Sequence, residues 1–467
     1  MPHILRNTPS DIASHPVVKE ENASPPAMFC YQCEMSTPGG CGSDGQTVGT
    51  CLKDANLARL QDIMLFGLKG LAAYREHARE LGADTTAVDD VMSETLYFTL
   101  TNVNFNFEEH IAQLMKLGAA GVQVMDKLSQ AHTCHLGVPT PVRVSQNRAE
   151  GKAILVSGHN LDMLRKLLEA TEGKGINIYT HSEMLPAHAY PSLRKYRHLK
   201  GNIGKSWTDQ TQLFQRWPGA IVINTNCIVP ARKGTDYYGR LFTYKITGAE
   251  GAMKIVDDDF GPLIEKALSL PEITGFDSDE TLMTGHHYQS VLGLAPQILE
   301  ALQAGKIRQF FVIAGCDAPG NAGNYYRELA ASLPLDCVII TSSCGKFRFN
   351  DLDFGAVPGT AIPRYLDLGQ CNDSNGAVHI ALALSEATGI ALDDLPVSIV
   401  LSWMEQKAVI ILLALFSLGI RNIYLGPKPP QFVNADILDF LVVNFGLHLT
   451  GTAQDDLSAL LIDKKAA

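Results

Sequence analysis

Short apolar runs that alternate with helical stretches constrain the fold of this chain more than any other feature. Eight runs follow residue 150, and seven of them end in His, Glu or Cys. In chain order they read KAILVSGH, GINIYTHSE, GAIVINTNC, QFFVIAGC, DCVIITSSC, RYLDLGQC, VSIVLSWME and RNIYLGP. This alternation is typical of repeated βα units around a buried parallel sheet.

Eight strands are too many for one small sheet. A less regular stretch from about residue 232 to 290 separates the first three runs from the others. We therefore predict an α/β fold with two Rossmann-like domains of mostly parallel strands, at residues 151–290 and 291–467. The length of 467 residues leaves room for a further N-terminal part.

Residues 28–150 predict a cysteine segment followed by a three-helix bundle. Within residues 54–81 the apolar side chains recur at helical spacing, and Asp54 suits the N-cap. The residues on this apolar face are Leu57, Leu60, Met64, Leu68 and Leu71. Residues 85–102 and 107–128 predict two more helices, and the short linkers favour antiparallel neighbours. Residues 1–27 are interpreted as a disordered leader.

Charge and hydropathy exclude several functional classes. The chain has 38 Lys and Arg residues and 49 Asp and Glu residues, which gives a net charge of −11. The protein as a whole therefore lacks the positive charge that would attract nucleic acid. No apolar run is long enough to span a bilayer, and residues 1–27 lack the features of a secretory signal. We therefore expect a cytoplasmic protein that binds neither nucleic acid nor membrane. Its ten cysteines would then serve metals or catalysis.

The strand ends carry the candidate chemistry. In open α/β sheets ligands bind beyond the carboxyl ends of the strands, so these side chains would meet at one site. Thiolate, imidazole and carboxylate together suit iron with sulfide and oxygen bridges, and the set exceeds what one tetrahedral ion needs. The sequence thus predicts a polynuclear iron cluster. Its predicted ligands are His159, Glu183, Cys227, Cys316, Cys344, Cys371 and Glu405.

A single cysteine at a strand end is more often a small buried hydrophobe than a ligand, so the prediction depends on the joint pattern. Cys134 and Cys337 lie outside the pattern, and we expect both to be buried, inert thiols. The adjacent pair His286 and His287 is interpreted as satisfied loop histidines. No G-x-G-x-x-G follows the first βα strand, so bound NAD is not expected.

A second candidate metal site lies near the N-terminus. Cys30, Cys33, Cys41 and Cys51 form a Cys-x2-Cys-x7-Cys-x9-Cys pattern. Zinc sites of four cysteines usually pair two Cys-x2-Cys knuckles, and only one is present here, which favours an iron–sulfur cluster. Such a cluster would relay electrons from an external donor to the deeper site. Its type remains open between 4Fe-4S, which we favour, and 2Fe-2S.

At these residues the chain resembles the hybrid-cluster (prismane) proteins, which are relatives of the nickel carbon monoxide dehydrogenases. The shared motifs, in the family's order, are MFCYQC, SGHN, THSEMLPAHAYP, NTNCI, AGCD, SSCGKF, LGQCNDS and SWMEQKAV. The resemblance implies a proximal Fe–S cluster on the four N-terminal cysteines. It also implies a hybrid iron–sulfur–oxygen cluster of the 4Fe-2O-2S type on the seven strand-end residues, with Cys316 as the persulfide candidate.

The resemblance further implies hydroxylamine reductase activity, in which two electrons and two protons give ammonia and water. Glu405, Lys407 or His159 could deliver the protons, and we favour Lys407 because it is not a ligand. Reduction of nitric oxide, or transfer of NO to protein thiols, is the alternative at the same cluster. A non-catalytic redox or NO sensor is the second alternative.

The region between Cys51 and His159 has room for one three-helix bundle, as in the short class of the family that lacks the second. The surface left by that loss could be covered in a homo-oligomer. The expected partners are a small nitrogenous substrate and an electron-donor protein, either a ferredoxin or a dedicated reductase.

Overall fold

A computed structural model describes residues 30–34, 36, 40–41, 51–231, 234–430 and 432–463. The predicted leader lies outside the described residues. The chain divides into two compact units. The first joins residues 1–128 to residues 403–450, and the second comprises residues 129–402 and 451–467.

The first unit is mainly helical. Its elements are α1 (Ala55–Glu80), α2 (Thr86–Phe98), the greater part of α3 (Phe107–Leu136), α12 (Gln406–Ser417), β13 (Ile423–Leu425), α13 (Ala435–Phe445) and β14 (His448–Leu449). Asp54 caps α1 by accepting a hydrogen bond from the Leu57 N–H, as predicted. The three N-terminal helices are confirmed. The second ends earlier than expected, at Phe98, and the third continues past the expected residue 128.

Glycines let helix α12 approach α1 and α3 closely. A Cβ atom at Gly118 in α3 would lie 2.1 Å from the Leu413 carbonyl oxygen, and one at Gly70 in α1 would lie 2.3 Å from that of Gln406. Only glycine tolerates such a backbone approach. This packing fixes the first turn of α12, which directly follows Glu405 and contains Lys407.

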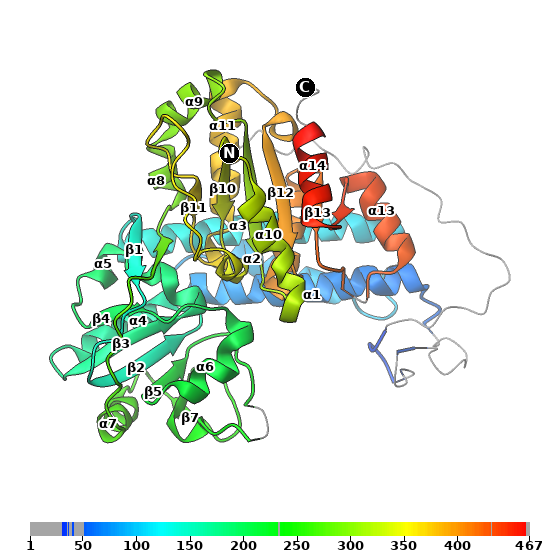
Figure 1. Ribbon diagram of the computed structural model, residues 1–467. Helices are drawn as coiled ribbons and strands as arrows, with labels where there is room; N and C mark the ends of the chain where they lie inside the picture. The colour runs from blue at the N-terminus through cyan, green and yellow to red at the C-terminus, as the bar shows by residue number, and fades with distance from the viewer. Residues whose placement is uncertain are drawn as a thin grey trace. The chain divides into compact units, whose positions relative to one another are not determined.

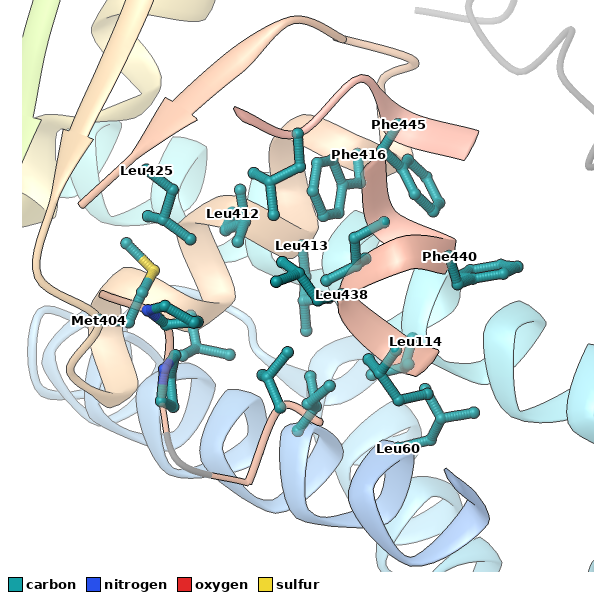
Figure 2. A pocket seen from close by; sticks show the side chains of 18 of the residues that line it. Leu60, Leu114, Met404, Leu412, Leu413, Phe416, Leu425, Leu438, Phe440 and Phe445 are labelled. Atoms are coloured by element: carbon teal, nitrogen blue, oxygen red, sulfur yellow. The ribbon is translucent and has the colours of Figure 1, made fainter. Parts of the chain in front are cut away.

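An apolar cavity of about 60 Å³ lies in the first unit among α1, α3, α12 and α13 (Figure 2). All described side chains that line it are apolar, among them Leu60, Leu114, Met404, Leu413 and Phe416. Cavities of this kind stay dry. Its lining side chains therefore offer no charged group and no hydrogen-bond donor for a polar substrate.

The first sheet of the second unit is wholly parallel, in the order β4-β3-β2-β5-β6-β7. Its strands are β2 (Lys152–Ser157), β3 (Ile176–His181), β4 (Leu199–Asn202), β5 (Ala220–Ile223), β6 (Leu241–Tyr244) and β7 (Met253–Ile255). Its helices are α4 (Leu161–Thr171), α5 (Pro191–Arg194), α6 (Gln210–Arg216) and α7 (Gly261–Ser269) (Figure 1). This is the doubly wound order, and its switch point lies between β2 and β5.

Alternate residues of β2 lie on opposite faces of this sheet and pack into different cores. Ile154 and Val156 belong to the core that contains residues of α4 and α7. Ala153 and Leu155 belong to the core that contains Phe214 of α6. Both faces are thus covered, which explains why the strand reads as a continuous apolar run.

The second sheet places β11 (Tyr365–Asp367), β10 (Cys337–Thr341), β9 (Gln309–Gly315) and β12 (Val397–Ser402) side by side and parallel. The associated helices are α8 (Tyr288–Leu292), α9 (Ala295–Gln303), α10 (Asn324–Ser332), α11 (Asn375–Thr388) and α14 (Ala453–Asp463). Here the switch point lies between β9 and β12. A small antiparallel pair is formed by β1 (Val142–Ser145) and β8 (Thr281–Thr284).

The predicted fold class is confirmed, and each of the predicted apolar runs contains a strand. The strands that sequence reasoning missed, β1, β4, β6, β7, β8 and β14, are short or lack a long apolar run. Among the described residues, no helix combines the length and apolar character required to cross a bilayer.

Candidate metal centre

Three predicted ligands from the two sheets meet in the second unit. His159 follows β2, Glu183 follows β3 and Cys371 follows β11, and one ligand atom of each lies within 4.8 Å of the others. The His159 Nε2 atom lies 3.9 Å from the Glu183 Oε2 atom. All three side chains are buried, so their polar atoms face one another rather than solvent. This is the donor arrangement that a buried metal requires.

The His159 ring is held by residues that follow β5. Its Nδ1 atom hydrogen-bonds the Thr225 hydroxyl at 2.9 Å, and its backbone N–H donates to the Asn224 side-chain oxygen at 3.0 Å. Because Nδ1 is engaged in this way, Nε2 is the nitrogen that faces Glu183. Such a partner on the second nitrogen fixes the tautomer and orientation of metal-binding histidines.

Gln370 ties the two sheets together beside the candidate ligands. Its fully buried side-chain amide donates to the carbonyl oxygens of His159, at 3.2 Å, and Glu183, at 2.7 Å. The next backbone N–H, that of Cys371, donates to the Glu183 carboxylate at 2.7 Å. These bonds define the relative positions of strand ends that are far apart in sequence.

Cys316 and Cys344 form a second group next to this one. A hydrogen bond with Cys316 and burial raise the pKa of the Cys344 thiol, and the charge of Glu183 adds to the shift. The Cys344 sulfur also accepts a hydrogen bond from the Asp317 N–H at 3.2 Å. The two thiols therefore lie close to each other and within electrostatic reach of Glu183.

Left-handed backbone recurs where the strands lead into the site. Positive φ angles occur directly before His159, Glu183, Cys316 and Cys344, at Gly158 (119°), Ser182 (52°), Gly315 (113°) and Ser343 (70°). Cys227 itself has φ 70°. In residues other than glycine this conformation is strained. Strained backbone of this kind is found most often at functional sites. Glycine adopts this conformation without strain at Gly158 and Gly315, whereas Ser182 and Ser343 adopt it at a steric cost.

We expect Gly158→Ala to destabilise the protein by about 3 kcal/mol, because left-handed strain and a steric clash add together. A Cβ atom there would lie 2.1 Å from the Asn224 oxygen that accepts the His159 N–H. The measurement is urea unfolding together with iron content. Gly173→Ala is the matched control, since Gly173 has φ 73° and open space around it. Equal stability losses in the two variants would contradict the steric explanation.

The other predicted site residues are not placed in the three-ligand group. Cys227 is half-buried at the end of the turn after β5, where its sulfur accepts a hydrogen bond from the Asn226 amide at 3.4 Å. Glu405 and Lys407 belong to the first unit. There, burial raises the pKa of the Glu405 carboxyl. The Lys407 ammonium group is buried and lies 5.0 Å from the centre of the Tyr74 ring. Their roles at a metal stay predictions.

The N-terminal cysteines lie in the first unit. Cys30 and Cys41 are buried against Ala58 of α1, and the Cys41 N–H donates to the Cys30 carbonyl oxygen at 3.0 Å. Cys33 and Cys51 are half-buried. In the described residues, none of the four forms a disulfide bond.

A buried lysine lies beside these cysteines. Lys53 is 2% exposed, and its ammonium group donates to the side-chain oxygens of Gln32, at 3.2 Å, and Gln61. Burial raises the pKa of Cys30, and the Gln32 backbone N–H and the charge of Lys53 oppose that rise. Within the described part of the chain, Lys53 forms no salt bridge with a carboxylate.

One expectation for the remaining cysteines is wrong. Cys134 is exposed rather than buried, because α3 extends to Leu136 and carries Cys134 on the outward side of its last turn. Cys337 is buried in β10, and burial raises its pKa to about 12, which fits an inert thiol.

The adjacent histidines His286 and His287 differ in their partners. His287 hydrogen-bonds the Ser129 hydroxyl at 3.3 Å, as expected of a satisfied histidine. His286 Nδ1 has no partner among the described residues.

Sequence reasoning missed several residues that support the site. Among them, Lys346 is fully buried, and its ammonium group donates to the Asp367 carboxylate at 2.9 Å and the Gly369 carbonyl oxygen at 2.7 Å. Burial opposes its charge, but Asp367 and Glu183 outweigh burial and raise its pKa. The sequence signal that could have identified such supporting residues is their closeness to a predicted ligand. Each of Thr225, Gln370 and Lys346 lies one or two residues from a predicted ligand.

The chain matches the Prismane/CO dehydrogenase family over residues 28–114 and 107–458. It is 48% identical over 434 residues to "Hydroxylamine reductase" of Moorella thermoacetica, covering 93% of this chain and 100% of that protein. It is 45% identical over 436 residues to "Hydroxylamine reductase" of Thermotoga petrophila, covering 93% and 99%.

Among solved structures, "Carbon Monoxide Dehydrogenase IV" from Carboxydothermus hydrogenoformans has the same fold. The TM-score is 0.73 at 14% identity, and the match covers 96% of this chain and 94% of that one. The family match spans most of the chain, the two relatives match over nearly their whole length, and the strand ends bring three of the predicted ligands together. The chain therefore belongs to the Prismane/CO dehydrogenase family.

Proposed function

We propose that this chain is an iron–sulfur oxidoreductase that reduces hydroxylamine to ammonia and water. The observation that carries the proposal is the buried meeting of His159, Glu183 and Cys371. The family supports iron–sulfur cofactors, and the relatives named hydroxylamine reductase are 48% and 45% identical over nearly their full length. The sensor alternative finds no such support.

The donor set of the second unit fits a mixed cluster. A carboxylate, an imidazole and several thiols lie together in a buried region. The set includes hard, intermediate and soft ligands, which suits iron bridged by both oxide and sulfide. The raised pKa of Cys344 keeps the thiol protonated in the free protein, so cluster binding would release that proton. We propose the hybrid 4Fe-2O-2S type here. Its ligands would be His159, Glu183, Cys227, Cys316, Cys344, Cys371 and Glu405, with Cys316 as the persulfide.

The N-terminal segment fits an anionic group. A buried cation needs compensating negative charge. Lys53 is bonded to neutral amide oxygens, and the Asp62 carboxylate lies within electrostatic reach of it but forms no salt bridge with it among the described residues. Four thiolates around an iron–sulfur cluster would add negative charge beside Lys53. We therefore propose a proximal cluster, of the 4Fe-4S type, on Cys30, Cys33, Cys41 and Cys51, which receives electrons from an external protein donor.

When bound, the deeper cluster would supply electrons and a Lewis-acidic iron for N–O cleavage. The chain's own residues would hold and protonate the substrate. Thr225 and Gln370 position His159 and Glu183, as their hydrogen bonds indicate. Lys407 remains the proposed proton donor, because an ammonium group can release a proton without giving up a metal bond.

The proposal predicts many turnovers of hydroxylamine, with one ammonia formed per two electrons from a common donor such as reduced ferredoxin. The protein is purified without oxygen, and its iron, sulfide and paramagnetic resonance are measured in several redox states. Two clusters of the proposed size require about eight irons per chain. Nitric oxide is tested with the same donor.

Three results would contradict this assignment. About four or fewer irons per chain would leave room for only one such cluster. A single stoichiometric response without turnover would support a sensor. Faster turnover of nitric oxide than of hydroxylamine would support the alternative substrate at the same cluster.

A further inference from the structure

The Gln32 side chain of the first unit contacts two groups of opposite charge. Gln32 lies between Cys30 and Cys33 in the sequence. Its side-chain oxygen accepts a hydrogen bond from the Lys53 ammonium group at 3.2 Å, and its side-chain nitrogen donates to the Asp62 carboxylate at 3.4 Å. We call Gln32, Lys53 and Asp62 the Gln32 clamp. It places a cation and an anion at the two ends of one amide within the cysteine segment.

Helix α1 brings the clamp to the cysteines. Cys30 and Cys41 are buried against Ala58 of α1. Asp62 lies one turn after Ala58, so both residues belong to the same face of the helix. The face of α1 that packs against the cysteines therefore also carries the Asp62 carboxylate.

Hydrogen bonds from α1 to α3 hold the Lys53 ammonium group in place. Lys53 also donates to the Gln61 side-chain oxygen. The Gln61 side-chain nitrogen lies 3.2 Å from His110 Nε2, and His110 Nδ1 lies 2.7 Å from the Asn106 carbonyl oxygen. Burial lowers the pKa of His110, which favours the neutral ring. Because a carbonyl oxygen only accepts, Nδ1 carries the ring proton and Nε2 accepts from Gln61. The Gln61 oxygen is thereby turned toward Lys53.

Neither charge of the clamp forms an ion pair among the described residues. The Asp62 Oδ2 atom is buried and has no hydrogen-bond partner in this part of the chain. Arg59 lies within electrostatic reach of Asp62, but its guanidinium group donates to the Phe432 carbonyl oxygen at 3.2 Å. Charges that are removed from bulk water are weakly screened, so both clamp charges act on their neighbours.

Both charges reach the first cysteine of the segment. Burial raises the pKa of the Cys30 thiol, whereas the charge of Lys53 lowers it and the charge of Asp62 raises it further. The potential of an iron–sulfur cluster depends on the charges and hydrogen bonds around it. Because reduction adds negative charge to a cluster, a nearby cation favours the reduced form and a nearby anion disfavours it.

We propose that Lys53 and Asp62 set the reduction potential of the proximal cluster in opposite directions, with the Gln32 amide holding both charges beside Cys30. Lys53 raises the potential and Asp62 lowers it. The inference rests on the proposed proximal cluster. The step concerned is the transfer of one electron, in which the external protein donor is oxidised and the cluster is reduced. No bond or proton moves at either clamp charge.

A redox titration of the full-length protein at about pH 8, followed by paramagnetic resonance, tests the clamp. The signal that the Cys33→Ala variant loses identifies the proximal cluster. We expect Lys53→Met to make one-electron reduction of this cluster about tenfold less favourable, which lowers the potential by about 59 mV. Asp62→Asn, which keeps the shape of the side chain, is expected to raise the potential by about the same amount. The Asp62 carboxylate is charged at this pH, since burial raises its pKa only to about 6.

Lys69→Met in α1 and Asp90→Asn in α2 are the matched controls. Each removes an exposed charge of the same unit, which solvent and salt screen. Neither control should shift the potential.

Opposite shifts in the two clamp variants support the inference, because a purely structural change would not reverse its direction with the sign of the deleted charge. Potentials equal to those of the controls, or shifts in the same direction, overturn it and leave the proximal cluster in place. If Lys53→Met fails to fold, the direction of the Asp62→Asn shift decides.

Two further outcomes separate the clamp from the proposed function. If Cys33→Ala loses no signal, the proposed proximal cluster is refuted, and the inference with it. Opposite shifts in a protein that does not reduce hydroxylamine support the clamp and refute only the proposed substrate.

Discussion

Glu183→Gln is expected to lower both the iron content and the hydroxylamine turnover of the purified protein, the latter by more than about 100-fold. Loss of an outer partner of a metal ligand already costs about 10- to 100-fold, and Glu183 is a proposed ligand itself. Its carboxylate also accepts the Cys371 N–H at 2.7 Å and faces His159 Nε2 at 3.9 Å. The neutral amide has the same shape, so the change tests charge and donor type rather than packing.

Glu169→Gln in α4 is the matched control, because Glu169 pairs with Arg165 on the surface at 2.8 Å. Exposed pairs of this kind contribute at most about 1 kcal/mol. The control should retain full iron and turnover. A Glu183→Gln protein with unchanged iron and activity would remove Glu183 from the proposed ligand set. Unchanged iron with lost activity would instead indicate a role in catalysis alone.

Acidification from pH 7 to pH 5 is expected to destabilise the second unit by roughly 5 kcal/mol. Burial lowers the pKa of four histidines in this unit from 6.5 to about 4, namely His132, His181, His188 and His287. Between these pKa values the unfolded chain binds more protons than the folded one. The stability is therefore complete above pH 6.5 and is lost as the pH falls toward 4.

Each histidine contributes about 2 kcal/mol to that loss. Asp373 opposes it by a similar amount, because burial raises its pKa to about 7 and the folded state then gains protons on acidification. Urea midpoints at several pH values measure the net slope. His132→Gln should flatten the slope by one histidine's share, whereas His448→Gln, at an exposed position of the first unit, should not. Equal midpoints at pH 5 and pH 7 would contradict the prediction.

The strands were predictable because their signal is local. A run such as KAILVS is apolar on both faces, and β2 is indeed covered by separate cores on its two sides. The short strands β6 and β7 were missed because they complete the sheet beyond its centre, where pairing with neighbours decides the conformation. The extension of α3 to Leu136, which exposes Cys134, depends likewise on packing rather than on pattern.

Parallel pairing explains why the meeting of candidate ligands could be predicted, whereas the residues that support them could not. Strands with carboxyl ends at the same edge must bring their following residues near one another, so His159 and Glu183 were expected together. The supporting contacts are different. Gln370 lies more than 180 residues from Glu183 in sequence and still donates to its carbonyl oxygen at 2.7 Å. Neither the periodicity nor the motif spacing contains such a contact.

Local sequence was enough to predict the central strands of the two sheets and the candidate ligands that follow them along the chain, because both depend on the order of apolar and polar residues along a strand and its end. Which buried side chains orient those ligands, and which polar atoms, such as Tyr365 Oη, have no partner among the described residues, became known from the folded chain alone. The reason is that hydrogen bonds and burial between distant segments depend on how the strands and helices pack, and a linear pattern does not specify that packing.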